Sequence, residues 1–165
     1  MIILLVCAGI VVVLGFTVFF GAPYVPSHKA ELERAFRIQR PLTKHDVLVD
    51  LGCGDGVVLR MAVSAGARKA VGVELNPVLG VVAKILTYQN KNIDVHLGNM
   101  WTSHLAKDTT VVYVFGVGRD MKKLEGLLES WSIDRGKPID LILYGHTLPN
   151  RKPERTVGAH HLYHF

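Results

Sequence analysis

The 165-residue chain is long enough for one domain and a short additional segment, and it combines a formal net charge of +5 with 49% hydrophobic residues. No run of Lys and Arg is interleaved with aromatic residues, so we expect no nucleic-acid partner. The two cysteines, Cys7 and Cys53, match neither a disulfide framework nor a zinc-binding spacing, and we expect no metal site.

The first predicted element is the apolar segment 1–22, MIILLVCAGIVVVLGFTVFFGA, which contains no Asp, Glu, Lys, Arg or His. About 20 residues of helix span a hydrocarbon core of roughly 30 Å. No basic residue precedes the run, and the run is too long for the core of a cleaved signal peptide. We therefore predict a single-pass transmembrane anchor that contacts the lipid bilayer. Lys29, Arg34, Arg37 and Arg40 follow the anchor, so the positive-inside rule places the rest of the chain in the cytoplasm.

Residues 23–41 are expected to form a linker and an N-terminal helix. Pro23 and Pro26 interrupt the preceding helix and make the linker short. Ser27 can cap a new helix that runs to about Gln39, and Pro41 ends it.

Residues 42–165 are expected to form one domain in which apolar strands alternate with helices. The strands are predicted at residues 47–51, 70–75, 93–97, 110–115, 140–144 and 160–165, and the helices at 57–65, 77–89 and after a capping Asp120. Strands that are apolar throughout are covered on both faces, so the pattern predicts an α/β fold with a parallel sheet. The proline-containing loop 146–158 stands where another crossover helix would be, so we expect a truncated C-terminal end.

The glycine-rich segment VDLGCGDG follows the first predicted strand and opens a helix. Gly52, Gly54 and Gly56 let the backbone turn sharply and approach a ligand at the carboxyl end of the strand. A dinucleotide-binding loop has the spacing GxGxxG, whereas this loop is GxGxG, and Asp50 would repel a pyrophosphate. The loop therefore favours a ligand with a cationic amino-acid end, such as S-adenosylmethionine, over NAD.

Two further residues follow the next two strands and extend the predicted cofactor site. Glu74 can accept hydrogen bonds from both ribose hydroxyls, and the amide of Asn99 can meet the edge of the adenine. The complete predicted cofactor-binding set is Asp50, Gly52, Cys53, Gly54, Gly56, Glu74, Leu75, Asn76, Asn99 and Met100.

These motifs resemble the class I S-adenosylmethionine-dependent methyltransferases, which implies a Rossmann-like fold. DLGCGDG matches the first motif of that superfamily, and Glu74 matches the acid of its second strand, whereas Asn99 replaces the Asp of many members. The chain is also similar to the small membrane-anchored protein-lysine methyltransferases of the ATP synthase c-subunit and adenine nucleotide translocase type, and to their prokaryotic relatives. The pieces that carry this narrower resemblance are the apolar anchor and the segments 24–27, 50–56, 74–77, 114–117 and 148–150.

The acceptor end of the site is predicted after the fourth and fifth strands. Phe115, Gly116 and Val117 would line an apolar channel, in which an amine loses its proton more readily. Tyr144 and His146 are candidates for a general base, although core packing also accounts for Tyr144 and a capped loop for His146. The segment has no Asn/Asp-Pro-Pro-Tyr motif, which argues against DNA adenine or glutamine as the acceptor.

The terminal strand carries His160, His161 and His164, for which a solvated edge strand is a simpler interpretation than a metal site. The sequence thus predicts an enzyme that transfers a methyl group from S-adenosylmethionine to a lysine of a membrane-associated protein. A lipid or small-molecule methyltransferase and a non-catalytic cofactor-binding scaffold remain as alternatives.

Overall fold

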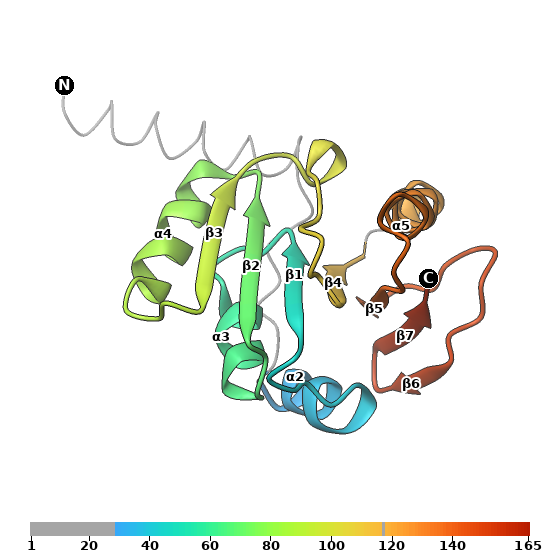
Figure 1. Cartoon of the computed structure of the whole chain (residues 1–165), viewed down its shortest axis with the longest axis horizontal. Helices are drawn as coiled ribbons and strands as arrows, with labels where there is room; N and C mark the ends of the chain where they lie inside the picture. Colours follow the sequence, from blue (N-terminus) through green and yellow to red (C-terminus); the bar gives the residue numbers. More distant parts are fainter. Residues whose placement is uncertain (1–28, 117) are drawn as a thin grey trace, which may run out of the picture.

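The computed structural model describes residues 29–116 and 118–165, so the predicted anchor at residues 1–22 lies outside the described part. Seven strands form one sheet: β1 (Val47–Leu51), β2 (Lys69–Glu74), β3 (Ile93–Leu97), β4 (Val111–Phe115), β5 (Asp140–Tyr144), β6 (Arg155–Val157) and β7 (His160–His164). Their order is β3-β2-β1-β4-β5-β7-β6 (Figure 1). β1 to β5 are mutually parallel, and β7 is antiparallel to both β5 and β6. The predicted α/β class is confirmed, as a mixed Rossmann-like sheet.

Helices connect the parallel strands and cover both faces of the sheet. They are α2 (Lys29–Arg34), α3 (Val57–Ser64), α4 (Pro77–Thr87) and α5 (Met121–Arg135), with a π-helical turn η1 (Ala35–Gln39) and 3-10 turns η2 (Met100–Thr102) and η3 (Gly118–Asp120). Asp120 stands at the N-cap position of α5 as predicted, but its side chain makes no capping hydrogen bond and instead pairs with Arg119. In the described part of the chain, no helix is long and apolar enough to cross a membrane.

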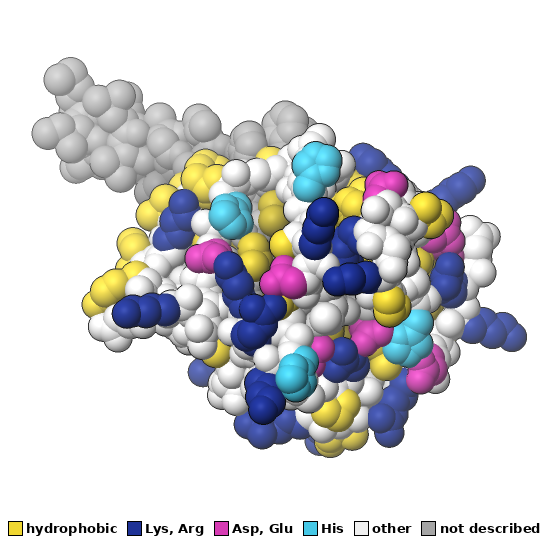
Figure 2. Space-filling model, viewed as in Figure 1, with side chains coloured by type: hydrophobic (Ala, Val, Ile, Leu, Met, Phe, Trp, Pro, Cys, Tyr) yellow, Lys and Arg dark blue, Asp and Glu magenta, His cyan; other side chains and the backbone are white. Residues whose placement is uncertain are grey.

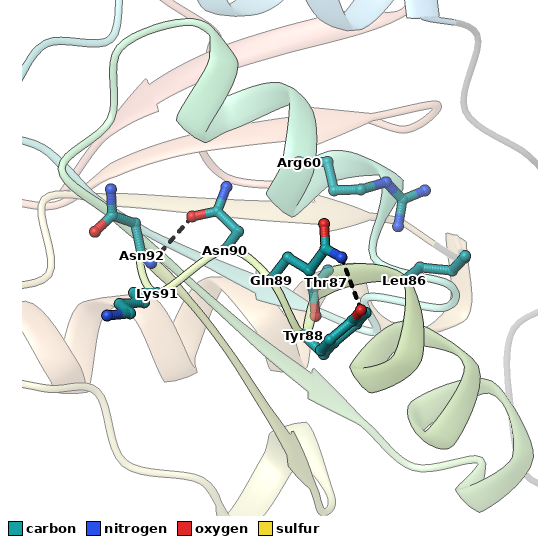
Figure 3. Close-up of a pocket in the computed structure, with 8 residues that line it drawn as sticks. All are labelled: Arg60, Leu86, Thr87, Tyr88, Gln89, Asn90, Lys91 and Asn92. Atoms are coloured by element: carbon teal, nitrogen blue, oxygen red, sulfur yellow. Dashed lines mark hydrogen bonds between the residues drawn. The ribbon is translucent and has the colours of Figure 1, made fainter.

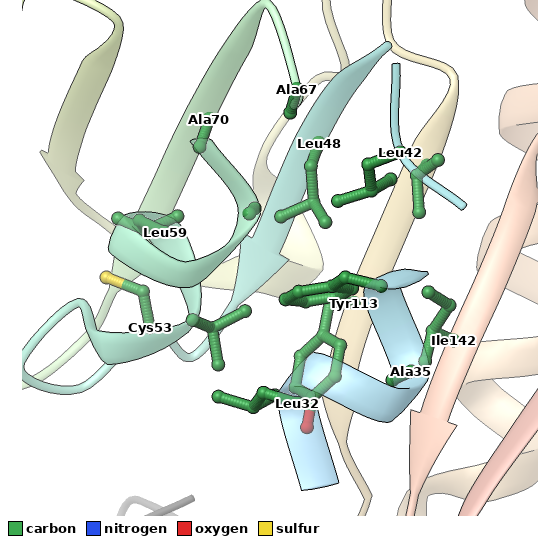
Figure 4. Packing of buried hydrophobic residues seen from close by; sticks show 14 of the residues in the cluster. Leu32, Ala35, Leu42, Leu48, Cys53, Leu59, Ala67, Ala70, Tyr113 and Ile142 are labelled. Carbon is green, nitrogen blue, oxygen red and sulfur yellow. The ribbon is translucent and has the colours of Figure 1, made fainter. Parts of the chain in front are cut away.

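The core lies on both faces of the sheet because alternate residues of each strand point to opposite sides. On one face Leu48 and Tyr113 pack with Leu32 of α2 and Leu59 of α3 (Figure 4). On the other face the strands pack against α5 through Leu124 and its neighbours. Burial on both faces explains why the two central strands, β1 and β4, consist almost entirely of apolar residues.

The C-terminal end of the sheet is larger than predicted. β6 lies within the segment 146–158 that we expected to be a loop, and it forms the sheet edge. β7 therefore lies between β5 and β6, and its His160 is buried, so the prediction of a solvated edge strand was wrong. β6 escaped prediction because its sequence, RTV, is short and mostly exposed, and its partners come from elsewhere in the chain.

The turn η1 fastens this C-terminal hairpin to the rest of the domain. Gln39 Nε2 donates to the carbonyl oxygens of Arg155 and His160, both at 2.9 Å. The next residue, Arg40, pairs with Asp46, at 2.8 Å, and with Asp140. The segment before β1 thus holds together the beginning of β1, the beginning of β5 and the β6–β7 hairpin.

Candidate functional site

The glycine loop is held against the carboxyl end of β2 by backbone hydrogen bonds. The N–H groups of Gly52 and Cys53 both donate to the carbonyl oxygen of Val73, at 2.8 and 3.1 Å. Gly52, Gly54 and Gly56 have φ values of 95°, 54° and 78°, in the left-handed region that favours glycine. The loop therefore adopts the tight turn that the sequence predicted, directly above the end of β1.

Glu74 joins three segments at the edge of the sheet. Its Oε2 accepts from the N–H of Gly54 at 2.8 Å, and its Oε1 accepts from the N–H of Asn76 at 2.7 Å. Asn76 in turn caps α4, since its Oδ1 accepts from the N–H groups of Val78 and Leu79. One buried carboxylate thus fixes the end of β2, the glycine loop and the first turn of α4.

Asp50 has a different environment, although it lies close to the same loop. Its side chain is almost completely buried, at 2% exposure, and Oδ2 has no hydrogen-bond partner among the described residues. Burial, followed by the negative charges of Glu74 and Asp55, raises the pKa of Asp50 well above its ordinary value. A buried carboxyl group without a donor is a favourable place for a cation, so the site fits the ammonium group of S-adenosylmethionine.

Cys53 supports the loop by packing rather than by reactivity. A Cβ added at Gly72 of β2 would lie 2.5 Å from Cys53 Sγ, so this glycine leaves the space that the thiol fills. Burial and the charges of Asp50 and Glu74 raise the pKa of the Cys53 thiol. The thiol therefore stays protonated at neutral pH and acts as a small apolar group.

The remaining predicted cofactor residues lie along the same edge of the sheet. Leu75 is partly exposed after β2, and Asn99 and Met100 follow β3. Asn99 Oδ1 accepts from the N–H of Trp101 at 3.0 Å and thereby caps η2. This local turn uses one of the two acceptor sites of the Asn99 oxygen, so the second acceptor site and the amide N–H groups are what the exposed side chain offers a ligand.

Beyond β4 and β5, the structure brings together the residues predicted for the acceptor end. Phe115 stacks on Tyr144, with ring centroids 5.4 Å apart. The exposed His146 lies beside Gly118, where an added Cβ would be 3.4 Å from His146 Cε1. Gly116 is buried against Leu143 and Met121, and Val117 lies outside the described residues. The observed groups therefore form an aromatic surface at the carboxyl ends of β4 and β5.

Polar groups that the sequence did not reveal surround Tyr144. A hydrogen bond with the carboxylate of Glu31, together with burial, raises the pKa of the Tyr144 hydroxyl. The ring of His160 lies against that of Tyr144, and its Nε2 is 3.1 Å from the hydroxyl oxygen of Tyr113. Burial lowers the pKa of His160 to about 4, so its imidazole is neutral. Glu31 precedes β1 and resembles any acid in a first helical turn, so no sequence signal pointed to this contact.

The other two histidines of β7 face separate neighbours. His161 Nδ1 is 3.0 Å from the hydroxyl oxygen of Thr156, whereas His164 pairs with Asp140 and Glu154. Across residues 29–116 and 118–165, no group of three or more His, Cys, Asp or Glu side chains is arranged to hold a metal ion.

An open pocket of about 440 Å³ lies at the C-terminal end of α4 (Figure 3). It is lined by Arg60, Leu86, Thr87, Tyr88, Gln89, Asn90, Lys91 and Asn92. None of the predicted site residues lines this pocket, although Arg60 and Thr87 lie next to Gly56 of the glycine loop. We therefore assign the functional site to the glycine loop and the strand ends.

The chain is a Rossmann-like methyltransferase by class. The strand order and the GxGxG turn define this class, together with a buried carboxyl group where a nucleotide-binding protein has a phosphate-binding surface. Within that class it belongs to the family of the ANTKMT methyltransferase domain, whose model matches residues 50–155. The methyl donor of this class is S-adenosylmethionine, which is accordingly the cofactor of the chain.

Two curated relatives are similar to most of the chain. The ATP synthase c-subunit lysine N-methyltransferase of Rattus norvegicus is 29% identical over 139 residues, which are 82% of this chain and 61% of the relative. The adenine nucleotide translocase lysine N-methyltransferase of Mus musculus is 30% identical over 111 residues, which are 66% of this chain and 47% of the relative. The chain thus spans about half to three fifths of the length of these relatives.

A solved structure supports the fold. The RNA methyltransferase of Salinibacter ruber, determined with S-adenosyl-L-homocysteine, superposes with a TM-score of 0.73 at 23% identity. The match covers 86% of this chain and 92% of that protein. At this level of identity the likeness establishes the shared fold.

Proposed function

We propose that the chain is a protein-lysine N-methyltransferase that acts on a membrane protein and is held at the membrane by residues 1–22. The observation that carries the cofactor assignment is the buried Oδ2 of Asp50, which has no partner in the described structure and lies under the glycine loop. The lysine acceptor is supported by the two relatives, both of which are lysine N-methyltransferases by name. The membrane location is supported by the uncharged sequence of residues 1–22.

In this proposal the two carboxylates divide the cofactor between them. Asp50 binds the ammonium group of the methionine end, and Glu74 accepts the ribose hydroxyls. Glu74 already accepts two backbone N–H groups, and a carboxylate has about four acceptor sites, so it can keep both while it binds the ribose. Asn99 and Met100 meet the adenine, and Leu75 and Asn76 complete the wall.

The cofactor supplies an electrophilic methyl group on a sulfonium whose leaving group is a neutral thioether. The protein must therefore align a neutral amine with that methyl group and exclude water from it. The aromatic surface of Phe115 and Tyr144 suits an aliphatic lysine stem, and its low polarity favours the unprotonated amine. The hydroxyl of Tyr144, with Glu31 behind it, is the group placed to accept a hydrogen bond from the amine, with the exposed His146 as the second candidate.

The decisive experiment uses the full chain in lipid vesicles with radiolabelled S-adenosylmethionine. The acceptor is the ATP synthase c-subunit in the same vesicles, and a soluble peptide that contains a lysine of the same protein is the comparison. We expect label in ε-N-methyl-lysine of the embedded protein and at least tenfold less in the peptide.

Matched variants separate a specific loss from a general one. Asp50→Asn and Glu74→Gln should lower the labelling rate at subsaturating cofactor about 10- to 100-fold, as expected for the loss of hydrogen bonds to charged groups. Asp94→Asn, at a surface ion pair with Lys69, should leave it unchanged. Label in methylarginine or in extracted lipid would contradict the lysine assignment. Cofactor binding without any label would favour a non-catalytic scaffold.

A further inference from the structure

Helix α4 buries its small residues and exposes its large ones. Gly80, Ala83 and Thr87 face the sheet and are buried. The packing there is tight, because a Cβ added at Gly80 would lie 2.2 Å from Leu97 Cδ2. A helix on the surface of a soluble domain ordinarily has the opposite arrangement, with its large apolar residues toward the core.

The large residues of α4 form a continuous outward stripe. Residues 78, 81, 82 and 85 are separated by three or four positions, so their side chains share one side of the helix. We call this stripe the α4 apolar face, and it consists of Val78, Val81, Val82, Ile85 and Leu86. Ile85 is 62% exposed and Val81 is 49% exposed.

The α4 apolar face continues onto neighbouring elements. Leu75 before the helix and Leu97 at the end of β3 are also exposed, and both lie next to the first turns of α4. Hydrophobic side chains recur along this side of the molecule, with Lys or Arg side chains between them (Figure 2). A contiguous exposed apolar surface of this kind marks a contact with another apolar phase.

We propose that the α4 apolar face lies in the membrane interface, among the outer parts of the acyl chains. This inference rests on the proposed membrane location of the chain. The segment 1–22 joins α2 through residues 23–28, which reach at most roughly 20 Å. Both α2 and α4 begin at the carboxyl edge of the sheet, because Glu31 contacts Tyr144 at the end of β5 and Asn76 follows β2. A bilayer that holds residues 1–22 is therefore close to the start of α4.

The chemistry of the surroundings also favours lipid over a protein cover. Residues 1–22 are apolar on every side of a helix, so packing them on α4 would still leave most of their surface in water. A bilayer covers both surfaces at once. Lys84 and Tyr88 border the α4 apolar face, and such residues extend to the headgroup region. The net charge of +5 favours a membrane with anionic lipids.

The test places one fluorescent label on the α4 apolar face and one on a matched exposed site. The full chain carries Cys7→Ser, and the buried Cys53 remains unlabelled because it is inaccessible. A polarity-sensitive probe is attached at Ile85→Cys or, as the control, at Ile133→Cys on α5, where the native side chain is 79% exposed. Vesicles contain phosphatidylcholine and phosphatidylserine, with or without doxyl-labelled lipid.

We expect doxyl lipid to reduce the emission of the probe at position 85 at least twofold and to leave the emission at position 133 unchanged. Aqueous iodide should reduce the emission at position 133 and leave that at position 85 unchanged. Access of iodide to position 85 would overturn the proposal. Shielding from both quenchers would also overturn it, in favour of a second copy or of residues 1–22 as the cover. Failure of the whole chain to float with vesicles would remove the membrane location itself, whereas flotation without quenching at position 85 would remove only the role of α4.

Discussion

Two carboxylates at the ends of neighbouring strands have opposite environments. Glu74 accepts two backbone N–H groups, whereas one oxygen of Asp50 has no partner in the described structure. In the absence of cofactor, the first residue stabilises the loop and the second is a cost to folding. This difference is consistent with the proposed role of Asp50 in binding the cofactor, because a cation there would offset the cost of the buried carboxyl group.

We predict that Asp50→Asn stabilises the cofactor-free protein near neutral pH and weakens the binding of S-adenosylhomocysteine about 10- to 100-fold. The pKa of Asp50 is higher in the folded protein than in the unfolded chain. When the pH is above the unfolded-state pKa, the folded protein therefore keeps a proton that the unfolded chain has lost. The free energy of unfolding then falls as the pH rises. Asn removes that penalty. Urea unfolding and calorimetric titration measure the two effects, and a less stable variant with unchanged affinity would contradict both.

The tight turn of the glycine loop and the positions of Asp50 and Glu74 beside it could be predicted from the sequence because short local spacings encode them. Glu31 could not, since it reaches Tyr144 only through the packing of α2 across the sheet. Asn99 was identified at the correct edge, but its local capping bond to the N–H of Trp101 appeared only in the structure. Residues whose partners are distant in sequence give no signal in a single sequence.

Among the elements, the parallel strands were predictable and the terminal hairpin was not. A strand such as β4, which is covered on both faces, is apolar throughout, and this gives a clear sequence pattern. β6 is short and polar, and it is held by Gln39 and by its pairing with β7, so its sequence resembles a loop. Because β6 was not predicted, β7 was expected at the edge of the sheet, whereas it lies between β5 and β6.

Two glycines on different elements should respond oppositely to the same substitution. Gly72→Ala places a Cβ 2.5 Å from Cys53 Sγ and 2.7 Å from Leu59 Cδ1, and we expect a loss of about 1–3 kcal/mol in the free energy of unfolding. Gly126→Ala in α5 has open space around its Cβ, and we expect a gain of about 0.5–1 kcal/mol because alanine favours the helix. Denaturant unfolding of both variants checks the pair, and equal effects would refute the assigned role of Gly72.

At the scale of the whole molecule, the buried neutral His160 makes stability depend on pH. Its folded-state pKa is about 4, below the unfolded value of about 6.5. Between these values the unfolded chain binds a proton that the folded chain does not, so stability falls as the pH decreases from about 7 toward 4.

His160→Gln should therefore reduce the loss of stability between pH 7 and pH 5 by about 1–2 kcal/mol relative to the unmodified chain. The free energies of unfolding of both proteins are measured at the two pH values. Asp50 is present in both proteins and makes stability fall as the pH rises, so its contribution cancels in the comparison. His45→Gln, at an exposed position before β1, serves as the control. An equal pH dependence in all three proteins would exclude His160 as the source.

The double attachment of Glu74 has a consequence for the proposed membrane contact. The same carboxylate holds Gly54 of the cofactor loop and Asn76, the residue that caps α4. Any shift of α4 on contact with lipid would therefore act through Glu74 on the glycine loop, which we propose binds the methyl donor. Thermodynamic reciprocity then requires that lipid and cofactor change each other's affinity by the same factor. An enzyme built in this way would sense, through its affinity for the cofactor, whether it is seated on a bilayer.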